Sequence, residues 1–412
     1  MKIKYRKLVI ILILYWSCLF FQSSNNFLNG NNILSYQESQ QLNSSSDGSF
    51  IWPTINWTTS SPEMQGVDSQ KLNEMDNLIQ SSTIRFNIDS LLIIRNGYLI
   101  YETYPSTIFD ADDTHHLFSV TKSFTSTLIG IAIDKGYIDN VNDYVLEFFP
   151  YIAIDNMNSW KEEIRIKHLL TMTTGLQWSD TINFDIMWWG SNDSVQYILN
   201  QPMIHPPGSI WNYNTGASHL LSAILNQVTP NGTLTFAEEF LFNPLGITDY
   251  VWYVDSQGIP NGGALLYLKP RDMAKLGYLY LMGGQWENQQ IVSREWTIQA
   301  SKPSILFPSF DGPLTGYGYQ WWGLFWGKVF AARGSYQQNI FIIPDLDIIV
   351  VTTGSYDFDP ISLLVNYIFP ATGYIVLNPY ITLLIFVPVL SLLFIIPFLV
   401  NNQSLKRKLR PR

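Results

Sequence analysis

Two short apolar runs, residues 90–95 and 98–102, flank the dipeptide Asn96-Gly97. Asn-Gly between apolar runs is the pattern most typical of a two-residue β-hairpin turn. Upstream, Asp68 is placed to cap an amphipathic helix that extends to about Ile79. The folded part of the chain is therefore predicted to begin with a helix followed by a hairpin.

Short runs rich in β-branched and aromatic residues return in the last quarter of the chain. They predict strands over 317–322, 325–332, 339–343 and 348–353, which are separated by Gly, Pro and Asp turns. Residues 361–369 predict a closing helix. Between the early and late strands, helix-like runs cover 118–133, 168–172 and 220–228.

Strands at both ends of the domain with helices between them are typical of an α+β fold. We expect an antiparallel sheet, built from both chain ends and flanked by helices, beside a mostly helical lobe. A cleft between sheet and lobe is the natural pocket. The helix that starts near Phe118 would begin at its floor.

The two ends of the 412-residue chain differ from its middle. Residues 1–22 read as a signal peptide or an N-terminal anchor, and 23–61 as a polar linker. Residues 62–372 form the predicted domain, and 378–401 a transmembrane helix whose core, 381–400, is almost entirely apolar. The basic tail 402–412 should stay in the cytoplasm, which places the domain outside the cell, anchored to the lipid bilayer.

Charge and cysteine content exclude several functions. Nine of the 24 Lys and Arg residues lie in the two ends, so the middle is strongly acidic. An acidic middle argues against nucleic-acid binding. The single cysteine, Cys18, allows no internal disulfide and no thiolate metal site. The polar loop 110–116 contains Asp112, Asp113, His115 and His116 without zinc-like spacing, so no metal or cofactor is expected.

The candidate chemistry begins with Ser119 and Lys122, three residues apart at the start of a predicted helix. Residues at this spacing lie on one helix face, so the lysine amine can reach the serine hydroxyl. A neutral amine can take the serine proton, which requires a lysine pKa far below its usual value of ~10.4. The alternative for this pair alone is a helix cap followed by a solvated lysine. The sequence has no G-x-S-x-G or H-E-x-x-H motif, and its five histidines form no obvious triad.

Residues 62–358 resemble the serine β-lactamase and penicillin-binding superfamily. The resemblance is strongest to the class C-type branch of esterases, DD-peptidase-like proteins and 6-aminohexanoate-dimer hydrolases. It rests on motifs in the family's order at 118–124, 168–176, 207–221, 244–247, 262–276 and 334–351. The resemblance implies the β-lactamase/DD-peptidase-like fold.

The resemblance also implies roles for individual residues. Ser119 would be the acylated nucleophile, Lys122 its proton partner and Tyr213 the tyrosine of the Y-x-N motif. Thr215 stands where that motif has Asn. The oxyanion hole would be the N–H groups of Ser119 and of Ser335, which follows Gly334.

One departure from the family concerns substrate charge. The K-T-G motif reads Ala332-Arg333-Gly334, so the cation that usually holds a substrate carboxylate is missing. If Ala332 points inward, Arg333 points to the other side of the strand. Five tryptophans are candidates for an aromatic substrate pocket, with core packing the alternative for at least half of them: Trp188, Trp189, Trp321, Trp322 and Trp326.

The sequence therefore predicts a membrane-anchored, extracytoplasmic serine hydrolase of esters or amides that needs no cofactor. Two alternatives stay open. One is a penicillin-binding DD-peptidase or β-lactamase, and the other is a catalytically silent binding module on the same fold.

Overall fold

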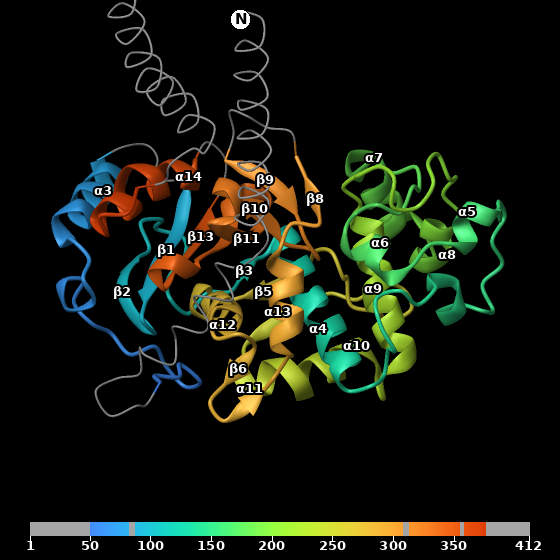
Figure 1. Ribbon diagram of the computed structural model, residues 1–412, viewed down its shortest axis with the longest axis horizontal. Coiled ribbons are helices and arrows are strands. Elements are labelled where there is room, and N and C mark those ends of the chain that lie inside the picture. Colours follow the sequence, from blue (N-terminus) through green and yellow to red (C-terminus); the bar gives the residue numbers. More distant parts are fainter. Residues whose placement is uncertain (1–49, 82–86, 308–312, 355–357, 376–412) are drawn as a thin grey trace, which may run out of the picture.

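The computed structural model describes residues 50–81, 87–307, 313–354 and 358–375. Its centre is an eight-stranded sheet in the order β2-β1-β13-β12-β11-β10-β9-β8, with antiparallel neighbours throughout (Figure 1). The strands are β1 (Ile88–Arg95), β2 (Tyr98–Thr103), β8 (Ile305–Leu306), β9 (Leu314–Tyr317), β10 (Trp322–Leu324), β11 (Val329–Gly334), β12 (Gln338–Ile343) and β13 (Ile348–Gly354).

The predicted hairpin and the joining of the two chain ends are both confirmed. Asn96 and Gly97 have φ of 52° and 80°, the left-handed values that a tight hairpin turn requires between β1 and β2. Strand β1 pairs with the last strand, β13, from Ile88 opposite Gly354 to Arg95 opposite Ile348. The fold is thus an α+β fold with one large antiparallel sheet, as expected.

Two predicted strand boundaries are wrong. Residues 318–321 are not strand but the turn from β9 to β10, in which Gln320 has φ 64°. The Gln320 side chain is buried and donates to the carbonyls of Leu169 and Leu170 at 2.9 and 3.1 Å. Strand β11 begins only at Val329, because the preceding residues form a short turn, η8 (Phe325–Gly327). Apolar residues continue through both turns because Trp321 and Phe325 are buried in the core. The apolar pattern of the sequence therefore does not indicate where these strands end or begin.

Helices cover both faces of the sheet. One apolar cluster joins Leu92, Ile94 and Ile340 to helices α4, α9 and α12, and the other joins Leu91 and Ile93 to α3, α14 and α15. Successive residues of β1 alternate between the two clusters, as the pleat of a strand requires. The helices in contact with the sheet or its connections are α3 (Ser69–Ser81), α4 (Thr121–Asp134), α12 (Pro270–Leu281), α13 (Arg294–Ser301), α14 (Pro360–Leu363) and α15 (Phe369–Ala371).

Most of the remaining helices form the expected helical lobe, which lies to one side of the sheet in Figure 1, whereas α11 (Asn243–Leu245) lies beside β6 (Gln285–Trp286). The helices of the lobe are α5 (Ser159–Glu162), α6 (Ile166–Leu170), α7 (Asp180–Asp185), α8 (Ser194–Leu199), α9 (Thr215–Val228) and α10 (Gly232–Ala237). Helix α9 begins five residues earlier than predicted because Asn214 caps it, its side chain accepting from the Ala217 amide at 2.9 Å. Small sheets complete the fold: β3 (His115–His116), β5 (Leu266–Leu268) and β4 (Tyr250–Trp252) in one, and β6 (Gln285–Trp286) with β7 (Gln289–Gln290) in the other.

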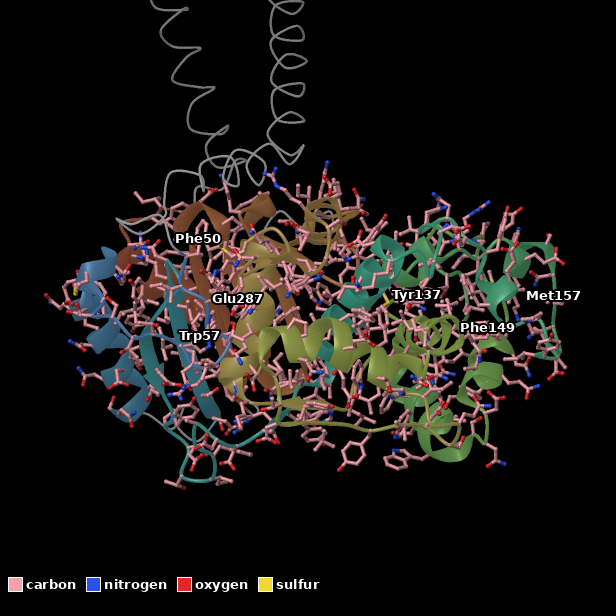
Figure 2. The ribbon with its side chains drawn as sticks, turned by 90° about the horizontal axis from the view of Figure 1, so that it is seen from below. Phe50, Trp57, Tyr137, Phe149, Met157 and Glu287 are labelled. Carbon is pink, nitrogen blue, oxygen red and sulfur yellow. The ribbon has the colours of Figure 1, made fainter. Side chains whose placement is uncertain are left out.

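Residues 50–61 belong to the domain rather than to a linker, which corrects the boundary expected at 61. Trp57 is buried, and its indole N–H donates to the Arg271 carbonyl at 3.0 Å. Figure 2 shows Phe50 and Trp57 on the sheet side of the molecule, away from Met157 at the far end of the helical lobe. The linker pattern missed these contacts because it weighed polar composition above the few large aromatic residues.

The predicted anchors lie outside the described residues. These are the segment 1–22, the span 378–401 and the tail 402–412. Within the described ranges, no helix has both the length and the apolar content that crossing a membrane would need.

Candidate active site

Ser119 lies in a short turn, η4 (Phe118–Val120), that leads from β3 into α4. Phe118 has φ 47°, a left-handed value that is costly for a bulky residue. Its ring is stacked on His116, 3.7 Å between centroids, and lies 4.8 Å from the ring of Tyr336. These contacts hold the turn in its strained form and leave Ser119 half-buried at the start of α4.

Lys122, in the first turn of α4, is buried with 1% of its surface exposed. Its Nζ lies 3.0 Å from Ser119 Oγ, 3.0 Å from Thr215 Oγ1 and 2.8 Å from the Gly263 carbonyl oxygen. Burial lowers the pKa of Lys122 to about 8, although the negative charge of Asp180 opposes the shift. The positive end of the α4 dipole also disfavours the ammonium. A sizeable fraction of this amine is therefore neutral near pH 7–8.

Gly263 brings its carbonyl to the lysine because it has no side chain. A Cβ at this position would lie 2.6 Å from Thr215 Cγ2 and 3.2 Å from Lys122 Nζ. Any larger residue would push this loop away from α4 and α9. With glycine at this position, the carbonyl accepts a hydrogen bond from the lysine amine.

Tyr213 lies beside the amine, just before α9. Lys122 Nζ is 4.9 Å from the centroid of its ring, which stacks on Trp322 at 5.8 Å and 26°. Burial raises the pKa of Tyr213, and a hydrogen-bond interaction with the Ser119 side chain offsets part of the rise. The phenol is thus protonated at neutral pH and close to the serine.

Asp180, the first residue of α7, is a member of the site that the sequence did not reveal. Its carboxylate accepts from the Thr215 amide at 2.9 Å and from the Thr215 hydroxyl at 2.6 Å. It also accepts from Trp178 Nε1 at 2.5 Å. Asp180 follows the motif at 168–176 by only four residues, but nothing local to it indicates its partner 35 residues away.

The end of β11 lies against the Ser119 turn. A Cβ built on Gly334 would be 3.0 Å from the Ser119 amide nitrogen and 2.5 Å from the Leu117 carbonyl oxygen. Ser335 follows directly and begins the turn η9 (Ser335–Gln337). The predicted oxyanion residues are therefore brought together, and their role stays a prediction.

Arg333 does not replace the missing cation of the K-T-G motif. Ala332 is fully buried in the cluster that contains α4, whereas Arg333 Nε donates to Asn339 Oδ1 at 3.1 Å. Asn339 in turn donates to Thr352 Oγ1 at 3.0 Å. The Arg333 side chain is thus bonded to the neighbouring strand β12, on the face of β11 opposite Ala332.

Of the five candidate pocket tryptophans, Trp322 is the one that contacts Tyr213 among the described ring pairs. Trp321 packs on Tyr280 at 4.4 Å in the core, and Trp188 on His219 at 6.0 Å. Trp189 is 76% exposed, and Trp326 packs against the core on the far face of the sheet. Core packing was therefore the better interpretation for most of them.

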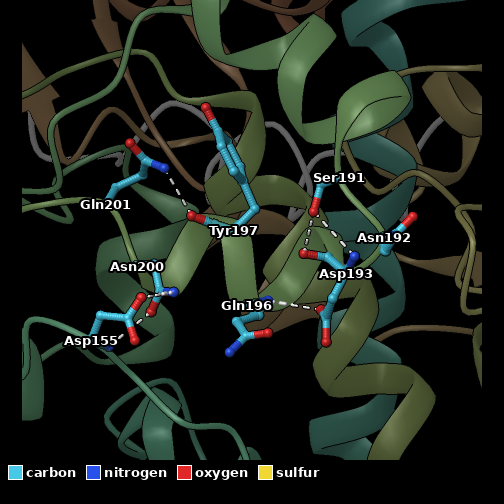
Figure 3. A pocket seen from close by; sticks show the side chains of 8 residues that line it. All are labelled: Asp155, Ser191, Asn192, Asp193, Gln196, Tyr197, Asn200 and Gln201. Atoms are coloured by element: carbon cyan, nitrogen blue, oxygen red, sulfur yellow. Dashed lines mark hydrogen bonds between the residues drawn. The ribbon is translucent and has the colours of Figure 1, made fainter.

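A polar hollow on the helical lobe lies apart from these residues (Figure 3). Its carboxylates are already paired: Asp155 accepts from Asn200 Nδ2 at 2.9 Å, and Asp193 caps α8 through the Gln196 amide at 2.8 Å. Among the described residues, no group of three or more His, Cys, Asp or Glu could hold a metal ion.

Known proteins resemble this chain in sequence and in fold. The family model described as Beta-lactamase matches residues 82–359, which is more than half of the chain. A 6-aminohexanoate-dimer hydrolase of Paenarthrobacter ureafaciens is 25% identical over 294 residues, covering 65% of this chain and 72% of its own length.

Two solved structures show the same fold at low identity. EstCE1, a hydrolase with promiscuous acyltransferase activity, superposes with a TM-score of 0.62 at 17% identity, over 74% of this chain and 99% of its own. The octameric penicillin-binding protein homologue from Pyrococcus abyssi superposes with a TM-score of 0.60 at 19% identity, over 74% and 78% of the two chains. With the family match covering the serine, the lysine and the whole sheet, this chain belongs to the β-lactamase family of serine hydrolases.

Proposed function

We propose that Ser119 is acylated by ester or amide substrates, with Lys122 as its general base. The observation that carries this proposal is a buried amine, its pKa lowered to about 8, 3.0 Å from the serine oxygen. A general base must be within hydrogen-bond reach and have a pKa near the working pH, and Lys122 meets both conditions.

The reaction follows from these positions. The Ser119 proton passes to Lys122 Nζ while Oγ bonds to the carbonyl carbon, whose π electrons move onto its oxygen. The N–H groups of Ser119 and Ser335 stabilise that oxyanion, which is typically worth about 3–4 kcal/mol for one such donor. The oxyanion then re-forms the carbonyl and the bond from its carbon to the leaving oxygen or nitrogen breaks, while Tyr213 gives its proton to the leaving alcohol or amine and regains one from Lys122. Water then releases the acyl group by the reverse sequence.

The substrate class is supported by the departure at 332–334 and by the relatives. Arg333 does not take the place of the missing cation, because its side chain bonds Asn339 on the face of β11 opposite Ala332. This favours esters and amides that need no carboxylate contact over penicillins and D-Ala-D-Ala peptides. The name of the Paenarthrobacter relative, 6-aminohexanoate-dimer hydrolase, is in line with hydrolysis of an amide bond.

A fluorophosphonate probe tests the nucleophile. The full chain should be labelled, Ser119→Ala should not, and the exposed-serine control Ser209→Ala should be labelled like the wild type. Labelling of Ser119→Ala would show that another residue is the nucleophile and would remove the proposal. Labelling of neither protein would also remove it and would favour the silent binding module. A fluorescent penicillin that labels Ser119 as fast as a simple aryl ester would favour the DD-peptidase or β-lactamase alternative.

We include in the same proposal that the domain lies outside the cell and is anchored to the membrane. It is supported by the apolar run 381–400, which is long enough for a ~30 Å hydrocarbon core, and by the basic residues after it. The full chain should remain in the membrane pellet after alkaline carbonate extraction, and protease added outside intact cells should digest the domain. Release of the full chain by carbonate would contradict the anchor without affecting the chemistry.

A further inference from the structure

The hydroxyl of Thr215 has one hydrogen and two candidate partners. Asp180 Oδ2 lies 2.6 Å from Thr215 Oγ1, and Lys122 Nζ lies 3.0 Å from it. A carboxylate can only accept, so the Thr215 hydrogen goes to Asp180. Toward Lys122, Thr215 can then act only as an acceptor.

Counting donors and acceptors in the same way shows which neighbour each hydrogen of the neutral Lys122 amine bonds. A neutral amine has two hydrogens and one lone pair, and Nζ has three near neighbours. The Gly263 carbonyl can only accept, and Thr215 is an acceptor because of Asp180. Both amine hydrogens are therefore used, and the lone pair remains for the third neighbour, Ser119 Oγ. Ser119 becomes the donor in this contact, which is the direction that proton removal requires.

We propose that Asp180 is a positioning residue that turns the Thr215 hydroxyl and thereby directs the Lys122 lone pair at Ser119. The inference rests on the proposed function of Ser119 and Lys122 and explains how a Y-x-T sequence serves where the family has Y-x-N. An Asn side-chain oxygen can only accept, so it needs no further partner to accept from the lysine. A Thr hydroxyl can also donate, so it accepts from the lysine only when its own hydrogen is bonded to another group. In this chain Asp180 is that acceptor.

The proposal makes a specific prediction for Asp180→Asn. The new amide can donate to Thr215 Oγ1, which frees the threonine hydrogen to occupy the lysine lone pair. We expect the rate of fluorophosphonate labelling to fall about 10–100-fold, the usual cost of misaligning a reacting pair. In Thr215→Asn the new amide oxygen can accept from Lys122 whether or not Asp180 carries a carboxylate. Adding Asp180→Asn to this variant should therefore lower the labelling rate by less than about threefold.

This double-mutant cycle separates positioning from simple support of the fold. Asp180 also holds the Thr215 amide and Trp178, and loss of those contacts would slow both backgrounds equally. Equal losses in the wild-type and Thr215→Asn backgrounds would overturn the proposal. Asp185→Asn, exposed at the other end of α7, is the matched control and should label at the wild-type rate.

A second readout needs no turnover. The titration of the Lys122 side chain can be followed by NMR of the isotope-labelled full chain in detergent. Removing the Asp180 charge should move it to lower pH in both the wild-type and the Thr215→Asn backgrounds. The shift should be larger where Thr215 is present, because the freed threonine hydrogen also bonds the lone pair of the neutral amine. Equal shifts in the two backgrounds would overturn the proposal. A wild type that is not labelled by the probe would count against the proposed function, and the comparison of the two titration shifts would still decide the role of Asp180.

Discussion

Gly334 lies directly against the amide of Ser119: a Cβ at position 334 would sit 3.0 Å from that nitrogen and 2.5 Å from the Leu117 carbonyl oxygen. The backbone of Gly334 is extended, with φ −129° and ψ 164°, so an alanine there would suffer no conformational strain. The glycine is needed for space alone. It lets the end of β11 approach the turn that carries the nucleophile.

Gly334→Ala should therefore separate β11 from Ser119 and slow acylation. We expect the labelling rate to fall about 100-fold, since one oxyanion donor is commonly worth that much. The thermal midpoint should change by only a few degrees. Gly190→Ala is the control, because its Cβ would meet only Ile186 Cγ2, at 3.7 Å, and it should label normally. A Gly334→Ala protein that labels at the wild-type rate would contradict the predicted oxyanion hole.

The pH dependence of acylation should report Lys122. Only the neutral amine can take the serine proton, and its pKa is lowered to about 8 by burial. The labelling rate should rise about tenfold per pH unit below pH 7 and level off above about pH 9. Tyr213 should add no descending limb in this range, because burial raises its pKa. Stopped-flow or gel-based labelling from about pH 5.5 to 9.5 measures the curve. A flat profile would indicate that another group takes the proton.

Tyr213→Phe should keep the fold and lose proton transfer. The ring stacks on Trp322 and lies beside Lys122, and phenylalanine preserves both contacts. Loss of the hydroxyl should lower ester turnover about 100–10,000-fold, the usual range for a general acid or base. The comparison variant is Tyr137→Phe, a half-buried tyrosine of the helical lobe that packs on Phe236. Turnover by Tyr213→Phe within a few-fold of the wild type would exclude the phenol from the reaction.

The parts of the fold and of the site that were predictable from spacing along the sequence are local ones. Ser119 and Lys122 are three residues apart at the start of one helix, and Asn96-Gly97 defines its own turn. Asp180 was not predictable, because its contact with Thr215 crosses 35 residues and depends on how α7 meets α9. Gly263 acts through a backbone carbonyl, which leaves no side-chain signal to find.

Adjacent tryptophans show the same limit. Trp321 and Trp322 must point to opposite faces of an extended chain, and alternation alone does not say which of them faces the cleft. The structure buries Trp321 against Tyr280 and puts Trp322 on Tyr213. The buried turn at Gln320, which accepts from Ser218 and donates to α6, decides the orientation. That turn is held by contacts from distant segments, so the strand pattern could not reveal it.

The buried lysine should make stability depend on pH in a defined direction. An exposed lysine side chain has a pKa of 10.5 and Lys122 in the fold has a pKa of about 8, so between these values the unfolded chain binds the extra proton. Stability therefore rises with pH across this window, and the full cost of the buried ammonium applies below about pH 8. A shift of this size corresponds to about 3 kcal/mol.

Lys122→Met removes this titration, so the stability of the variant relative to the wild type should be greatest below pH 8 and should fall by about 3 kcal/mol as the pH approaches 10.5. Urea unfolding of both proteins at a series of pH values measures the difference, in which other titrating groups cancel. A difference that stays constant, or that grows with pH, would mean that Lys122 is not held in a site that disfavours its charge, and the amine would then be a poor base for Ser119.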